Sequence, residues 1–236
     1  MTEKRKTAIL ISGRGTNMSA LLRAAAEADY PATITGIISD QADAPGLAAA
    51  EAAGMRAIAV PRTEHADKAA HEAALEEALG ELEAELICLA GFMRLLSSAF
   101  VERWQGRMIN IHPSLLPLFK GLSSHRRALD SGMRVHGCTV HFVTAETDGG
   151  PIIAQAAVPV VPGDTEESLG ERVLKTEHQL YPLALALVAS GRARMEDGKT
   201  LFTETGDIGW GERASLIVPS SLAEALNLED LARRTP

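Results

Sequence analysis

The sequence has few cysteines, no long apolar run and fewer basic than acidic residues. Its two cysteines, Cys88 and Cys138, lie in apolar segments with no neighbouring cysteine at metal-ligand spacing, which predicts buried thiols rather than ligands. The seven histidines show no HExxH-like spacing, so we expect no metal site. The formal net charge is -8, from 23 Lys and Arg against 31 Asp and Glu, which disfavours nucleic acid and anionic membranes as partners.

No segment is apolar for long enough to span a membrane. The basic residues at 4–6 resemble the start of a signal peptide, but the apolar run that follows, residues 8–11, is too short for an export signal. We therefore expect a cytoplasmic protein. Its 236 residues suffice for one sizeable core or two small domains.

The first half, about residues 1–105, alternates short apolar runs with alanine-rich segments of helical period. This pattern predicts a βαβ series with parallel strands, helices on both faces of the sheet and ligands at the carboxyl ends of the strands. The predicted strands cover residues 8–11, 34–39, 57–60 and 86–90, and the predicted helices cover residues 18–27, 46–53 and 67–83.

The second half, about residues 106–202, predicts a mixed or antiparallel continuation of the sheet. Its expected elements are strands at 108–112, 137–143 and 151–160 and a helix near 125–130. A further helix opens with Asp164 as N-cap and Glu167 three residues on, is interrupted at Pro182 and ends at Gly191. The predicted fold is thus a three-layer αβα domain over residues 1–202. Residues 203–236 are expected to be an extension of unknown role, either docked or partly disordered, in which a helix cap at Ser221 predicts a short helix through Leu231.

Asn110 and His112 are two residues apart on a predicted strand, so their side chains point to one face. Pro113 ends the strand, which puts both side chains at a sheet edge where α/β proteins place their chemistry. From these residues alone, a buried strand that ends in a hydrogen-bonded histidine remains the simpler alternative.

A glycine turn at residues 12–17 joins the first strand to the first helix, and its amides offer a phosphate site. The turn fits neither standard nucleotide fingerprint, because Met18 stands where GxGxxG needs its third glycine. Asp40 at the end of the second strand leaves an NAD-dependent oxidoreductase as a weaker alternative, and a turn without a ligand remains open.

Glu177 places a carboxylate on an apolar helix stripe, either as a functional group or as an edge residue or ion-pair partner.

Several motifs together resemble the folate-dependent formyltransferases. They are residues 110–117, Gly121-Leu122 with His125, residues 141–143 and 148–153, supported by residues 12–17, 90–94, 177–178 and 181–182. The resemblance covers about residues 7–202 and implies a Rossmann-like parallel half that continues into a mixed sheet. Relatives that act on tRNA carry an additional carboxyl-terminal domain, and relatives that hydrolyse the folate carry an amino-terminal one. This chain has room for neither, which favours the members that act on glycinamide ribonucleotide.

The resemblance implies transfer of the formyl group of 10-formyltetrahydrofolate to the amine of glycinamide ribonucleotide, without a metal, by a monomer or homodimer. By position, the catalytic residues are Asn110, His112 and Asp148. The residues implied for the ribonucleotide are Gly15, Thr16, Asn17 and Glu177, and those implied for the folate are Lys68, Met93, Arg94, Leu95, Leu96 and Asn110. Arg107 and Arg172 also match family positions, with contact or structural pairing left open. The alternatives are a hydrolase that releases formate and a noncatalytic nucleotide-binding module.

Overall fold

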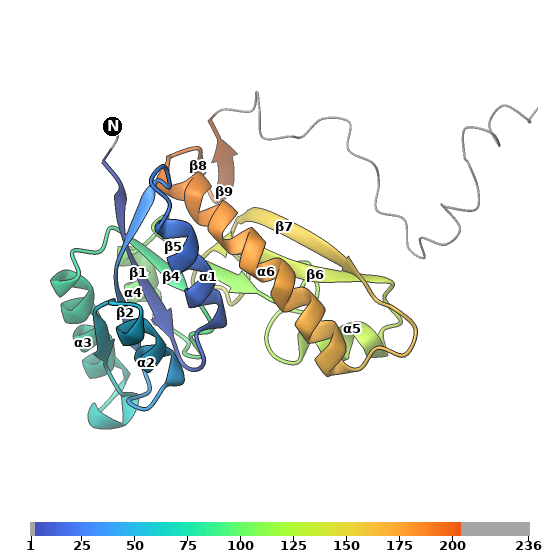
Figure 1. Ribbon diagram of the computed structural model, residues 1–236, viewed down its shortest axis with the longest axis horizontal. Helices are drawn as coiled ribbons and strands as arrows, with labels where there is room; N and C mark the ends of the chain where they lie inside the picture. Colours follow the sequence, from blue (N-terminus) through green and yellow to red (C-terminus); the bar gives the residue numbers. More distant parts are fainter. Residues whose placement is uncertain (1–2, 204–236) are drawn as a thin grey trace, which may run out of the picture.

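The computed structural model describes residues 3–203, which form a seven-stranded sheet flanked by helices and followed by a two-stranded hairpin (Figure 1). The strands of the main sheet are β1 (Arg5–Ile11), β2 (Ala32–Ser39), β3 (Ala57–Ala59), β4 (Leu86–Leu89), β5 (Met108–His112), β6 (Val135–Phe142) and β7 (Ile152–Pro159). The helices are α1 (Thr16–Ala25), α2 (Pro45–Ala52), α3 (Lys68–Glu81), α4 (Ser98–Arg103), α5 (Ser124–Asp130) and α6 (Glu166–Ala189), with a 3-10 turn at Arg62–Glu64. The hairpin consists of β8 (Ala193–Glu196) and β9 (Lys199–Phe202).

The strands lie in the order β3-β2-β1-β4-β5-β6-β7. The first five run parallel, and β6 is antiparallel to both β5 and β7, which confirms the predicted change of character in the second half. The strand order reverses between β1 and β4, because the chain extends the sheet to β3 and then returns to the other side of β1. Such a reversal leaves a crevice at the carboxyl ends of the strands, where open α/β sheets bind ligands.

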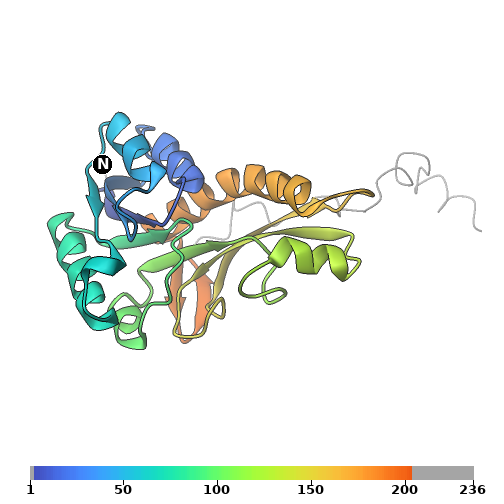
Figure 2. The same ribbon diagram turned by 90° about the horizontal axis from the view of Figure 1, so that it is seen from below.

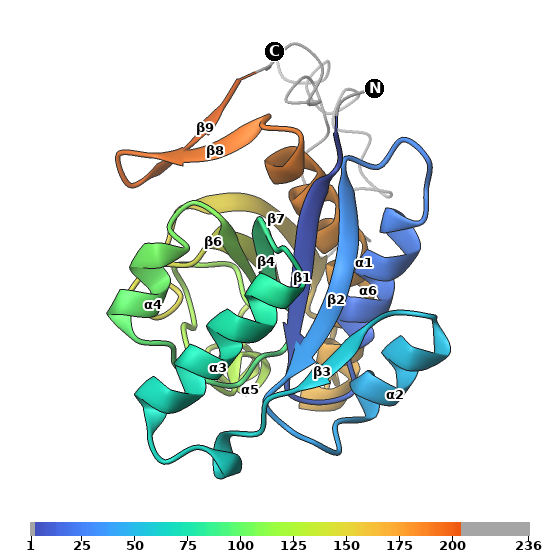
Figure 3. The same cartoon turned by 90° about the vertical axis from the view of Figure 1, so that its left-hand side faces the viewer.

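Two apolar clusters sandwich the sheet. One includes side chains of α1, α2 and α6, and the other includes side chains of α3 and α4. Figures 2 and 3 show these two groups of helices on opposite sides of the sheet. The observed arrangement is therefore the predicted three-layer αβα fold, and both cysteines are buried thiols as expected.

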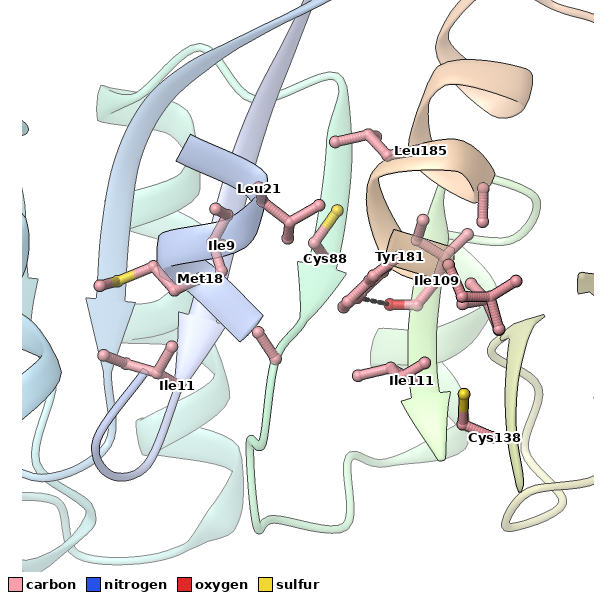
Figure 4. Close-up of a cluster of buried hydrophobic side chains, with 14 of the residues drawn as sticks. Ile9, Ile11, Met18, Leu21, Cys88, Ile109, Ile111, Cys138, Tyr181 and Leu185 are labelled. Atoms are coloured by element: carbon pink, nitrogen blue, oxygen red, sulfur yellow. Dashed lines mark hydrogen bonds between the residues drawn. The ribbon is translucent and has the colours of Figure 1, made fainter. Parts of the chain in front are cut away.

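Tyr181 connects the long helix α6 to the centre of the sheet (Figure 4). Its side chain is fully buried, and its hydroxyl lies 3.0 Å from the carbonyl oxygen of Leu89 on β4 and 3.1 Å from that of Ile109 on β5. A buried phenol needs such partners, because an unpaired hydroxyl in an apolar core is destabilising. The contact fixes α6 over the two strands whose ends carry predicted site residues.

Two details of α6 differ from the prediction. The helix runs without interruption through Pro182, because its buried face offsets the roughly 3 kcal/mol cost of an internal proline. Its capping box joins Thr165 and Ser168 rather than Asp164 and Glu167. The side chain of Asp164 instead accepts hydrogen bonds from Ser168 and Arg172.

The sequence pattern missed α4, the 3-10 turn and the β8–β9 hairpin, which are short elements of three to six residues. Elements of that length show too few periods for recognition. The predicted helix from Ser221 to Leu231 lies outside the described residues. Within residues 3–203, no helix is long and apolar enough to cross a membrane.

Candidate active site

Strand β5 brings Asn110 and His112 to the carboxyl edge of the sheet, where β6 adds His141. Asn110 lies directly opposite His141 in the antiparallel register, and its amide nitrogen is 3.3 Å from His141 Nε2. His112 and His141 are 6% and 2% exposed. The expected pair therefore becomes a group of three polar side chains on two strands, in which both histidines are buried and Asn110 is partly exposed.

Asp148 completes this group from the turn that follows β6. Its Oδ2 atom lies 3.4 Å from His112 Nδ1, and its Oδ1 atom lies 3.7 Å from His141 Nε2. The backbone N–H of Gly121 donates to Oδ2 at 2.8 Å. Asp148 has φ of 50°, a left-handed conformation that aspartate tolerates in turns. The predicted catalytic residues Asn110, His112 and Asp148 are thus brought together.

Opposing effects set the charge of Asp148. Burial raises its pKa, but hydrogen bonds from His141 and the Gly121 amide, with the charges of His112 and His141, outweigh that effect and lower the pKa to about 2. The group is therefore a carboxylate throughout the physiological range. A carboxylate between two imidazoles stabilises positive charge on either ring and can relay protons between them.

The hydrogen-bond partners assign one proton to each histidine. Phe119 O lies 3.0 Å from His112 Nε2, and Phe142 O lies 2.8 Å from His141 Nδ1. Because a carbonyl oxygen only accepts, both of these ring nitrogens must be protonated. His112 Nδ1 then faces Asp148, and His141 Nε2 is free to accept from the Asn110 amide or, when protonated, to donate to Asp148.

The sequence reasoning did not assign a site role to His141 or Gly121. His141 occupies alternate positions with Thr139 on a predicted strand, but its partner depends on the β5–β6 register, which the sequence does not show. The Gly121 amide is a backbone group and leaves no side-chain signal. The loop that carries it returns to Asp148 across 27 residues.

The glycine turn after β1 has the features of an anion site. Gly15 is the N-cap of α1 with φ of 70°, and no side chain caps the helix, so its first-turn amides remain available to a ligand. The side chain of Asn17 is 8% exposed and donates to Glu177 Oε2 at 2.7 Å. The structure thus joins two of the residues implied for the ribonucleotide across 160 positions of sequence.

Glu177 is buried among apolar residues and is 6% exposed. Burial raises its pKa, and the hydrogen bond from Asn17 counteracts this in part. Its hydrogen-bond partner, Asn17, is neutral, so Glu177 is neither an exposed edge residue nor, among residues 3–203, an ion-pair partner of a buried arginine. Its carboxyl group is held in place by Asn17 of the glycine turn.

The segment after β4 carries Met93, Arg94, Leu95 and Leu96. Met93 and Leu95 are 70% and 73% exposed, which is unusual for large apolar side chains. Arg94 Nε donates to Asp40 Oδ2 at 2.5 Å, and Asp40 is 2% exposed. Asp40 is therefore buried and engaged by an arginine, which disfavours the oxidoreductase alternative.

Two hollows open at this edge of the sheet. One, of about 240 Å³, lies in the β1–β4 crevice and is lined by residues 12–17 together with Ala90, Gly91 and Met93. The other, of about 260 Å³, is lined by Arg62, Lys68, His71, Glu72, Arg94, Leu95 and Leu96. Lys68 Nζ lies 3.9 Å from Glu72, which holds this cation over the second hollow. Met93 therefore lines the first hollow while Arg94, Leu95 and Leu96 line the second, so the two hollows adjoin along the segment after β4.

The two additional arginines have structural partners. Arg172 makes two hydrogen bonds with Asp164 and a third with Pro159 O. Arg107 lies over the Trp104 ring, 4.5 Å from its centroid, and donates to Arg103 O. Among residues 3–203, no group of three or more His, Cys, Asp or Glu side chains is arranged to hold a metal ion.

Known proteins resemble this chain in sequence and in fold. A family model described as formyl transferase matches residues 5–185. The trifunctional purine biosynthetic protein adenosine-3 of Gallus gallus is 48% identical over 199 residues, which cover 84% of this chain and 20% of that protein. The chain thus spans about a fifth of the length of that relative. The phosphoribosylglycinamide formyltransferase of Escherichia coli is 42% identical over 80% of this chain and 89% of its own length.

Solved structures agree with these matches. Glycinamide ribonucleotide transformylase 1 of Symbiobacterium toebii aligns with a TM-score of 0.83 and 45% identity, over 86% of this chain and 96% of that chain. A formyltetrahydrofolate deformylase of Pseudomonas syringae aligns with a TM-score of 0.78 and 26% identity, over 86% of this chain but 67% of its own. The family match over most of the chain, together with the shared fold, establishes that this chain belongs to the formyl transferase family.

Proposed function

We propose that this chain transfers the formyl group of 10-formyltetrahydrofolate to the primary amine of glycinamide ribonucleotide. The products are N-formylglycinamide ribonucleotide and tetrahydrofolate, a step of purine synthesis. The observation that carries the proposal is the cluster of Asn110, His112, His141 and Asp148 at the same sheet edge as the glycine turn. Relatives also support the proposal, because a phosphoribosylglycinamide formyltransferase and a glycinamide ribonucleotide transformylase align with this chain over most of their own length.

The reaction needs no nucleophilic side chain, because the substrate amine attacks the formyl carbon directly. A tetrahedral carbon forms whose oxygen develops negative charge, and this charge needs a hydrogen-bond donor. Asn110 has an amide nitrogen with a second N–H besides the one that faces His141. That N–H is the proposed donor to the developing oxyanion.

Protons must leave the attacking amine and reach N10 of the folate. His112 faces Asp148 through Nδ1, and an ionised carboxylate stabilises positive charge that develops on the imidazole during the reaction. Asp148 is the proposed acceptor, directly or through water, of the amine proton. The proton taken from the amine is passed on, through His112 or water, to N10 as its bond to the formyl carbon breaks, so one proton leaves the amine and one reaches the leaving nitrogen.

The proposed substrate sites lie at the two hollows and along the segment between them. The proposed phosphate ligands are the amides of Gly15, Thr16 and Asn17, and Glu177 is the proposed ligand of the ribose or amine end. The folate would lie along Met93, Arg94, Leu95 and Leu96, with Asn110 at its reactive end and Lys68 near the second hollow. Action as a monomer or homodimer in the cytoplasm is part of the same proposal.

The decisive experiment mixes the purified protein with 10-formyltetrahydrofolate and glycinamide ribonucleotide and follows tetrahydrofolate by absorbance and the formylated product by mass spectrometry. We expect turnover that depends on the amine. Formate release without the amine identifies the hydrolase instead. If the ribonucleotide binds but no formyl is lost from the folate, the noncatalytic nucleotide-binding module replaces the proposed activity.

A further inference from the structure

We propose that Ser12 is a positioning residue that couples the two substrate sites, so that the bound ribonucleotide strengthens binding of the folate and the reverse. The inference rests on the proposed function, because it needs both substrates. Its structural basis is a pair of hydrogen bonds between the glycine turn after β1 and the segment after β4. One of the two bonds depends on the Ser12 side chain.

Ser12 is the first residue after β1 and begins the turn that leads to Gly15 and α1. Its backbone N–H donates to Gly91 O at 3.1 Å. Its hydroxyl oxygen accepts the backbone N–H of Met93 at 2.8 Å. A single residue of the turn therefore holds two backbone positions of the segment that the folate is proposed to contact.

That segment has little regular structure to hold it, since residues 92–97 lie in neither a helix nor a strand. Its anchors are mostly side chains of other elements: Asp40 binds Arg94, and Glu72 accepts from the backbone and hydroxyl of Ser97. Met93 stands between the buried Phe92 and these anchors, with its own side chain 70% exposed. The Ser12 hydroxyl therefore determines where the backbone of Met93 is held.

On the other side of the link, the turn is anchored at Gly13. Gly13 O accepts the backbone N–H of Gly46 at 3.0 Å, and a Cβ atom on Gly46 would lie 2.7 Å from that oxygen. The turn is thus packed tightly against the start of α2. A phosphate bound by the amides of Gly15 to Asn17 restricts the motion of the turn further. Through its hydroxyl, Ser12 then restricts the position of the Met93 backbone as well. Both segments line the same hollow, which brings the two ligand sites into direct continuity.

The expected coupling is the effect of one neutral hydrogen bond, which corresponds to about fivefold in affinity. Thermodynamic linkage requires that the factor be the same in both directions. Replacing Ser12 by alanine removes the hydroxyl but keeps the backbone bond to Gly91. The affinity for each ligand alone should therefore change little, while the mutual strengthening disappears.

The test uses isothermal titration of tetrahydrofolate into the full chain, in reducing buffer, alone and with saturating glycinamide ribonucleotide. This pair is unreactive because no formyl group is present. The variants are Ser12→Ala, Ser12→Thr, which keeps the hydroxyl, and Ser190→Ala as a control at the end of α6, where the serine hydroxyl contacts its own helix. Thermal unfolding of each variant checks that the fold is retained.

We expect about fivefold tighter binding of tetrahydrofolate with the ribonucleotide present in the wild type, Ser12→Thr and Ser190→Ala, and less than twofold in Ser12→Ala. Reverse titrations should give the same factors, and the KM for the formyl donor should fall with ribonucleotide concentration in wild type but not in Ser12→Ala. Unchanged coupling in Ser12→Ala overturns the inference, as does loss of coupling in both Ser12 variants. Failure of the wild type to bind either ligand overturns the proposed function itself, whereas binding of both ligands without coupling overturns this inference alone.

Discussion

Replacing Asp148 with asparagine removes the charge of this residue but keeps its size and its hydrogen bond within the fold. The variant keeps an oxygen that accepts the Gly121 amide, so the turn after β6 stays closed. What disappears is the negative charge 3.4 Å from His112 Nδ1. The substitution thus tests whether Asp148 takes part in proton transfer.

The stability cost follows from the pKa of Asp148. A fall from 3.8 to about 2 corresponds, at 1.36 kcal/mol per pH unit, to about 2 kcal/mol. Since the pKa is lower in the folded state, this stabilisation is fully present above about pH 4 and is lost as the pH falls toward 2. We expect Asp148→Asn to lose at most about 2 kcal/mol of unfolding free energy at pH 7 in urea denaturation.

The activity loss should be much larger than this stability loss explains. Removing a group that handles protons lowers turnover by about 10²–10⁴-fold, while the affinity for the ribonucleotide stays within about threefold. Single-turnover assays and isothermal titration measure the two effects, with Asp29→Asn as an exposed acid control. Unchanged turnover in a folded Asp148→Asn protein refutes the assignment of Asp148 to proton transfer.

Three further predictions follow from the site and its surroundings. Asn110→Ala should lower turnover by about 10²-fold or more in steady-state assays, as for one lost oxyanion donor; an effect confined to KM makes Asn110 a binding residue. Glu177→Gln removes a buried charge, so the free protein should gain stability above pH 4.5 in denaturation experiments while ribonucleotide affinity falls in titrations; unchanged affinity contradicts the assigned contact. Burial and the neighbouring His125 lower the pKa of His136 from 6.5 to about 4, so the wild type should lose stability as the pH falls through this window, by about 2 kcal/mol at pH 5. His136→Gln should lack this loss in urea unfolding between pH 7.5 and 5, and an identical pH dependence would falsify the assignment to His136.

Local patterns in the sequence determined most of the elements that form the sheet and its covering helices. The strand at Met108–His112 was predicted with the bounds that the structure has, because its apolar alternation and Pro113 are both local signals. The same alternation placed Asn110 and His112 on one face. Pro182 shows the limit of such signals, since tertiary packing along α6 outweighed a local helix breaker.

The strand order and the register decided the rest of the site. They put His141 opposite Asn110, Glu177 beside Asn17 and Arg94 on Asp40, pairs that are 31, 160 and 54 residues apart. Hydrophobic periodicity fixes which face a side chain occupies, but not which distant strand lies next to it. Residue types and their spacing along the chain thus determined the elements and the candidate chemistry. The tertiary structure alone decided the partners, because contacts such as that of Ser12 with Met93 exist only once β1 and β4 lie side by side.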